Sequence, residues 1–103
     1  PSLTYIHNHL TMFNFTIIRS SSAISAIHCD VLQGLALVSF KNGNVYAYSN
    51  VSRKAMLNLK FNPSISLGFW VNNNCIKSNR VRYQNVTGLV GYYGSPENYF
   101  ATV

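Results

Sequence analysis

Two tyrosines with a pair of cations shortly after them are the residues of this sequence best placed to do chemistry. Tyr46 and Tyr48 lie two apart in a run typical of a β-strand, so both rings should project from one side of a sheet. Arg53 and Lys54 follow in the first turn of an expected helix. Aromatic rings stack on nucleobases and cations contact phosphates, so this pattern favours nucleic-acid binding. The alternatives are that both rings pack beneath the helix, and that the cations are an ordinary surface pair.

A second cationic segment lies at residues 77–84, KSNRVRYQ, and is the densest basic stretch of the chain. Arg80 and Arg82 would lie on one side of an extended strand, where they could contact successive phosphates. The sequence therefore predicts a nucleic-acid-binding set made of Tyr46, Tyr48, Arg53, Lys54, Lys77, Arg80 and Arg82.

The composition is consistent with one folded, basic domain. The 103 residues carry eight Lys and Arg against two acids, a formal net charge of +6, and 48% are hydrophobic, which argues against disorder. A basic balance suits nucleic acid, an acidic protein or a membrane surface, although it can also serve solubility alone. Only 10% of residues are charged, well below the ~25% of an average soluble domain. Such a surface leaves room for a permanent protein partner or a homo-oligomer.

Catalytic and metal-binding patterns are weak. His7 and His9 would share one face of a strand, but no third ligand supports them, so we expect no metal and no cofactor. His28 is better explained as a core or strand-edge residue than as a catalyst. With no paired carboxylates and no nucleophile beside a base, the chain is not expected to be an enzyme. Convergence of His28, Asp30 and Cys75 in one pocket would reopen that question.

The two cysteines, Cys29 and Cys75, lie far apart in sequence and outside any C-x-x-C motif. We expect a reduced, buried pair in a cytoplasmic protein, with one disulfide as the alternative; a virion is the other location considered. The sequence has no run of about 18 apolar residues, so no membrane span is predicted, and no signal peptide is visible.

Periodicity divides the chain into short elements. Alternating residues predict strands at 12–18, 23–29, 35–40 and 45–48, with a turn at 41–44. Helical spacing predicts helices at 52–60 and 67–76, capped by Ser52 or Asn50 and by Ser64 or Ser66, and a further strand is expected from 86 to 93. In the second strand, strict alternation would place Ile24, Ala26 and His28 on one face and Ser25, Ile27 and Cys29 on the other.

The hairpin segment carries a family resemblance. Residues 40–48, FKNGNVYAY, fit the pattern F-x-x-G-x-x-Y-x-Y, and a serine–glycine helix start with an aromatic and an Asn follows at Ser66, Gly68, Trp70 and Asn72. An opening S-x-I strand fits residues 22–24 or 25–27. Residues 22–76 therefore resemble the KTSC domain, a small bacterial and phage family named for a segment at the C-terminus of some lysyl-tRNA synthetases.

The resemblance implies a β-meander followed by helices and a suspected RNA-binding module. This chain departs from it at the less charged end of the second helix, residues 72–75, and residues 1–20 and 77–103 match nothing in the family. We therefore expect a single α+β domain, in which a small antiparallel β-meander is followed by two short helices, with extra N- and C-terminal strands or arms. Its parts would be an N-terminal extension (1–21), a KTSC-like core (22–76) and a basic, then Gly- and Tyr-rich, C-terminal extension (77–103).

The favoured function is a small non-enzymatic module that binds nucleic acid, RNA in particular. The rival is a structural or assembly protein, either a phage particle component or an accessory subunit of a larger complex. The low charge and the Gly- and Tyr-rich C-terminal segment motivate this rival.

Overall fold

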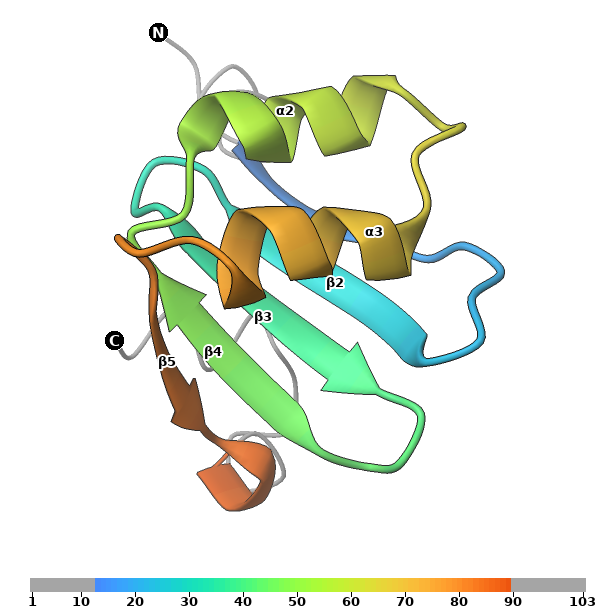
Figure 1. The fold of residues 1–103 in the computed structure, drawn as a ribbon, viewed down its shortest axis with the longest axis vertical. Helices are drawn as coiled ribbons and strands as arrows, with labels where there is room; N and C mark the ends of the chain where they lie inside the picture. The colour runs from blue at the N-terminus through green and yellow to red at the C-terminus, as the bar shows by residue number, and fades with distance from the viewer. Residues whose placement is uncertain (1–12, 90–103) are drawn as a thin grey trace, which may run out of the picture.

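Within residues 13–89, the part of the chain that the computed structural model describes, five strands form one antiparallel sheet (Figure 1). The strands lie side by side in chain order, so each pairs with its sequence neighbours. They are β1 (Asn14–Ile17), β2 (Ile24–Asp30), β3 (Leu35–Phe40), β4 (Val45–Ser49) and β5 (Arg82–Asn85). The predictions for His7, His9 and residues 90–103 lie outside the described residues.

Two helical segments separate β4 from β5 and cover one face of the sheet (Figure 1). They are α2 (Arg53–Phe61) and α3 (Leu67–Val71), which continues as the π-helical turn η1 (Asn72–Ile76). Ser52 caps α2 by accepting the Ala55 N–H at 3.1 Å, and Ser66 caps α3 by accepting the Phe69 N–H at 3.3 Å. The predicted α+β fold, a meander followed by two short helices with extra strands, is confirmed.

The asparagine run 72–74 does not break the second helix because its side chains bond the backbone. The Asn73 amide donates to the Phe69 carbonyl at 2.8 Å, and the Asn74 amide donates to the Trp70 carbonyl at 3.0 Å. Both acceptors lie one turn earlier, where the change from α to π spacing alters backbone pairing. Residues with low helix propensity therefore stabilise this irregular turn.

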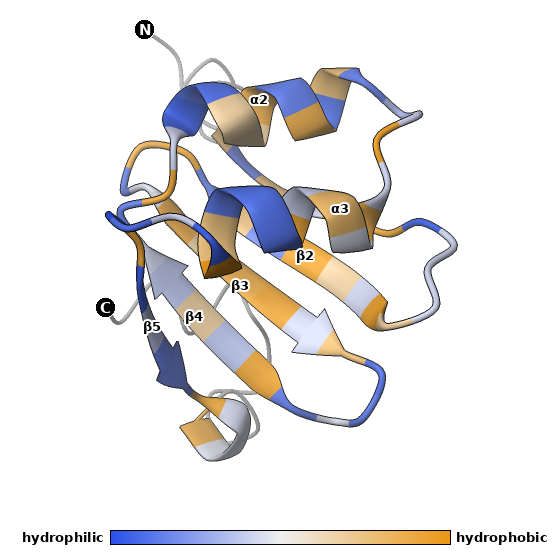
Figure 2. Ribbon diagram, viewed as in Figure 1, coloured by the Kyte–Doolittle hydropathy of each residue, from blue (hydrophilic) through white to orange (hydrophobic). Residues whose placement is uncertain are grey.

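The main core lies between the sheet and the helices. Figure 2 shows hydrophobic residues along β2, β3 and β4, whereas the start of α2, the asparagine run of η1 and β5 are hydrophilic. Trp70 is buried at the centre and its indole N–H donates to the Ala55 carbonyl of α2 at 2.9 Å, which joins the two helices. The most deeply buried members include Ile27, Cys29, Val38, Met56 and Leu59.

The strict alternation predicted for β2 is wrong at its start. Ile24 pairs with Phe40 and Ala26 pairs with Ser39, so Ser25 is one extra residue opposite β3. This β-bulge lets Ile24 join the same core as Ile27, instead of sharing a face with Ala26.

The last predicted strand is also misplaced. β5 occupies residues 82–85, whereas residues 87–89 are helical, so the prediction of a strand over 86–93 is wrong for its described part. Arg80 precedes β5 and lies in a turn, so Arg80 and Arg82 do not share one strand as predicted. β1 and β5, which belong to the two expected extensions, are the edge strands of the same sheet.

Candidate nucleic-acid interface

An aromatic cluster forms where β4 and β5 lie under η1. Tyr48 pairs with Tyr83 in the sheet register, so the alternation of both strands brings Tyr46 and Tyr83 to the helix-covered face. The Tyr46 and Tyr83 ring centroids are 6.3 Å apart at 75°, an edge-to-face contact. Tyr46 also contacts Phe40 edge-to-face, with 5.7 Å between centroids, and Tyr48 with 6.3 Å between centroids.

A cavity of about 310 Å³ opens beside this cluster. Tyr48 and Cys75 form its buried part, whereas Tyr83 and Ile76 are 74% and 59% exposed and form its two lips. The cavity is thus bounded by the sheet on one side and by η1 on the other. Its complete lining is Tyr46, Tyr48, Cys75, Ile76, Val81 and Tyr83.

Tyr48 does not offer a ring face to solvent, which corrects the prediction that it stacks on a base. Its side chain is 6% exposed and belongs to the core under the helices. Burial raises the pKa of Tyr48 to about 12, and the neighbouring Cys75, Tyr46 and Tyr83 add to the shift. Tyr48 therefore serves as the floor of the cavity, while Tyr46 remains half-buried and contacts Tyr83.

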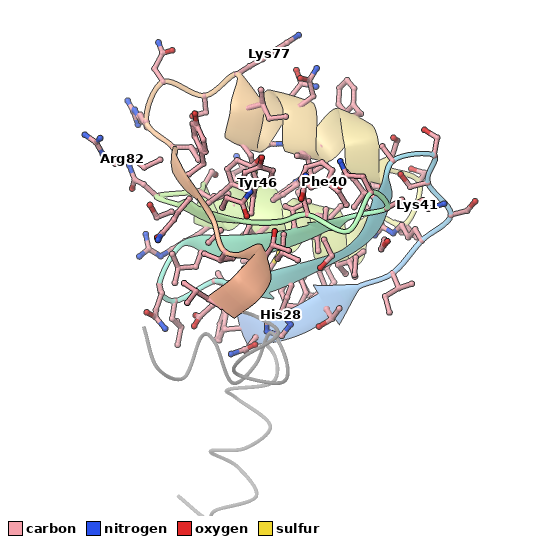
Figure 3. All side chains as sticks on the ribbon, turned by 90° about the horizontal axis from the view of Figure 1, so that it is seen from below. His28, Phe40, Lys41, Tyr46, Lys77 and Arg82 are labelled. Carbon is pink, nitrogen blue, oxygen red and sulfur yellow. The ribbon has the colours of Figure 1, made fainter. Side chains whose placement is uncertain are left out.

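Three of the predicted cations are sequence neighbours of residues that line the cavity. Lys77 follows Ile76, while Arg80 and Arg82 flank Val81, and all three cations are exposed. The Asn50 amide donates to the Arg80 carbonyl at 3.1 Å, so the turn before β5 is held against the β4–α2 connection. In Figure 3, Arg82 lies on the opposite side of the molecule from Lys41, which sits in the β3–β4 turn, whereas Lys77 projects from the end of η1 between them.

The other two predicted cations lie at the start of α2, at the same end of the molecule as the η1–β5 connection (Figure 1). Arg53 donates to the Leu32 carbonyl at 2.9 Å, so part of its guanidinium anchors the β2–β3 turn. Lys54 is exposed, and among residues 13–89 its amine has no hydrogen-bond or ion-pair partner. Neither cation lines the aromatic cavity.

The three cations outside the predicted set have different environments. Arg19 donates to the Leu59 and Ile65 carbonyls, which fastens the β1–β2 connection to the end of α2. The Lys60 amine lies 4.8 Å from the centroid of the Phe15 ring. Five of the eight cations therefore belong to the start of α2 and to the η1–β5 connection, which lie at one end of the molecule (Figure 1), whereas Lys41 is an exposed cation in the β3–β4 turn.

His28, Asp30 and Cys75 do not converge. His28 is 3% exposed and lies on the opposite face of the sheet from Tyr46, hydrogen-bonded through its two ring nitrogens to Asn14 and Thr16 (Figure 3). The Asp30 carboxylate instead accepts from the Gln33 backbone and side chain. Cys75 lies in the helix-side core, and within residues 13–89 no group of three His, Cys, Asp or Glu residues could hold a metal ion.

Both thiols are free, as expected from the sequence. Burial raises the pKa of Cys29 and of Cys75 from 9.0 to about 12, and the proximity of Cys75 adds to the shift at Cys29. Neither is therefore an activated nucleophile.

Tyr83 lines the cavity but is not one of the residues predicted from the sequence. Its signal was present, because it is the only aromatic residue in the basic segment 77–84. Its importance depends on β5 pairing with β4, which brings it against Tyr46.

Comparison with known proteins shows which solved structure the fold is similar to. No protein-family model matches the sequence, and no curated protein matches it. The crystal structure of the KTSC domain protein YPO2434 from Yersinia pestis is similar, with a TM-score of 0.55 and 19% sequence identity over 70% of this chain and 96% of that chain. The resemblance predicted from the sequence is therefore confirmed at the level of the fold: this chain has the fold of a KTSC domain. No helix within residues 13–89 has the length and hydropathy to cross a membrane.

Proposed function

We propose that this protein is a small non-enzymatic module that binds nucleic acid, RNA in particular. The observation that carries the proposal is the gathering of five cations at the end of the molecule that holds the aromatic cavity. Cations follow a phosphate backbone, and aromatic rings stack on bases whatever their sequence. The preference for RNA over DNA rests on the KTSC resemblance described above.

The charge balance of this end supports a polyanionic ligand. Within residues 13–89 the single acidic residue is Asp30, and it is buried with its carboxylate bonded to Gln33. In the same part of the chain, the side-chain nitrogens of Lys77, Arg80 and Arg82 have no protein partner. Such cations can exchange their counterions for phosphates without breaking a protein contact.

The environments of the polar core residues support a non-enzymatic role. His28 is buried on the other face of the sheet and held by Asn14 and Thr16, and the raised pKa of Cys75 keeps its thiol protonated at neutral pH. Neither group is in a state suited to act as a general base or a nucleophile.

The test is binding of a fluorescein-labelled single-stranded RNA of twelve uridines at low salt, followed by anisotropy. We expect the double variant Arg80→Ala/Arg82→Ala to bind more weakly than the wild type, while Lys41→Ala binds as the wild type does. Lys41→Ala removes an exposed charge on the opposite side of the molecule from Arg82. No binding at low salt, or equal losses per charge in both variants, would reject the proposal. An oligomer in sizing chromatography together with no RNA binding would instead favour the structural or assembly role.

A further inference from the structure

The cavity between β5 and η1 has the size and chemistry of a pocket for one planar group. Its volume of about 310 Å³ lies at the small end of the ~300–1,000 Å³ typical of ligand sites. The exposed lips, Tyr83 and Ile76, offer an aromatic ring on one side and an aliphatic side chain on the other. A flat heterocycle between them would gain apolar contact on both faces.

The chain neighbours of the lining residues indicate which planar group fits. Ile76 is followed by Lys77, Val81 lies between Arg80 and Arg82, and Tyr83 follows Arg82. Ile76 therefore has a cation next to it in the chain, whereas Arg82 alternates with Tyr83 and belongs to the other face of β5, at the edge of the sheet. An apolar side chain of a partner protein would make no use of those charges. A nucleobase carries a phosphate on each side along its strand, so it matches an apolar pocket next to the η1–β5 connection, which carries Lys77 and Arg80.

We infer that this cavity takes a single unstacked base of a single-stranded nucleic acid, with Tyr83 as the residue on which it stacks. The inference rests on the proposed function and adds its binding mode and a residue outside the predicted set. A base paired inside a duplex is stacked on both faces and cannot enter. The protein should therefore prefer unpaired strands over a duplex of the same sequence.

The polar atoms of the pocket are few. The hydroxyl groups of Tyr46, Tyr48 and Tyr83 are its side-chain hydrogen-bonding groups, because the remaining lining side chains are apolar or a protonated thiol. Stacking therefore provides most of the contact, and such contacts tolerate all four bases. Discrimination between bases should be modest.

The test compares three variants on two probes. The probes are an RNA of eight adenosines and a ribose-phosphate chain of the same length without bases. The variants are Tyr83→Ala, Tyr83→Phe and Phe61→Ala, the last removing an aromatic ring that is 64% exposed at the far end of α2. Because Tyr83 is so exposed, Tyr83→Ala should fold, and thermal unfolding confirms it.

We expect Tyr83→Ala to bind the adenosine RNA about 5- to 140-fold more weakly than wild type, the range that loss of one stacked base produces. Tyr83→Phe should retain affinity, Phe61→Ala should bind as wild type, and the base-free chain should show no effect of Tyr83→Ala. A 2-aminopurine placed in the RNA should lose fluorescence on binding to wild type and recover it with Tyr83→Ala. If the RNA binds but Tyr83→Ala matches Phe61→Ala, or if the base-free chain binds equally well, the pocket inference is wrong and the proposed function stands. If neither probe binds at low salt, both are wrong.

Discussion

The salt dependence of RNA binding can be predicted from the positions of the cations. Among residues 13–89, four cations of the cluster have no protein partner for their charged groups, whereas Arg53 already donates to Leu32. For a single strand, log K falls with log salt by about 0.7 for each phosphate neutralised, so four contacts give a slope of about −2.8. A fourfold rise in salt, from about 50 to about 200 mM, should then weaken binding by about 50-fold. The four cations are Lys54, Lys77, Arg80 and Arg82.

Single variants measure how much each cation contributes to the slope of log K against log salt. Arg82→Ala should reduce it to about −2.1, so that the same rise in salt costs only about 18-fold. Arg53→Ala should leave the slope near that of the wild type, because its guanidinium is engaged by the β2–β3 turn. Lys41→Ala should also leave it unchanged. The assay is anisotropy of a labelled uridine 12-mer at five salt concentrations. A slope near zero, or equal reductions from Lys41→Ala and Arg82→Ala, would refute the reasoning.

Three further predictions concern the core and the connections. Arg19→Ala should lower the free energy of unfolding by about 2–4 kcal/mol. The half-buried guanidinium donates one hydrogen bond to Leu59 near the end of α2 and one to Ile65 in the loop that follows, and both are lost. Gly34→Ala should cost about 1–2 kcal/mol, because its φ is +70° and a Cβ would lie 3.4 Å from the Val51 carbonyl oxygen. Alkylation of Cys29 and Cys75 at pH 8 should be about 10³-fold slower in the folded than in the unfolded protein, because the pKa of each thiol rises from 9.0 to about 12.

Each of these predictions has a control or an opposing result. Gly88→Ala, where a Cβ meets nothing within 4 Å, should change stability less than Gly34→Ala does in urea unfolding. An Arg19→Ala midpoint equal to that of the wild type would contradict the anchoring role. The thiols also predict a pH effect: stability should hold below pH 9 and fall between pH 9 and about 12, because the unfolded thiols ionise first. Stability that rises over that window would contradict the stated cause.

The local elements could be predicted because their signals are local. The turn at Gly43, which has a φ of +95°, and the caps at Ser52 and Ser66 act over three or four residues. The alternation of apolar residues likewise predicted four of the five described strands.

The predictions were wrong where contacts between residues far apart in the sequence determine the structure. The bulge at Ser25 exists because Ile24 reaches the core, which no neighbour in sequence indicates. Tyr48 is buried because η1 covers it, and Tyr83 matters because β5 pairs with β4 across more than thirty residues. The spacing of two tyrosines correctly placed them on one face but could not distinguish a cavity floor from an exposed platform.

The most direct test of the account is a titration of ¹⁵N-labelled protein with an RNA of eight adenosines, followed by backbone amide chemical shifts. We predict that the shifts concentrate in β4, the start of α2 and residues 75–85, with the largest changes near Ile76 and Tyr83. The chemical shifts of the amides around His28, whose side chain lies on the other face of the sheet, and around Lys41 should not change. Shifts centred on those two regions, or no shifts at low salt, would contradict the claim that the cationic end with its aromatic cavity binds a single strand.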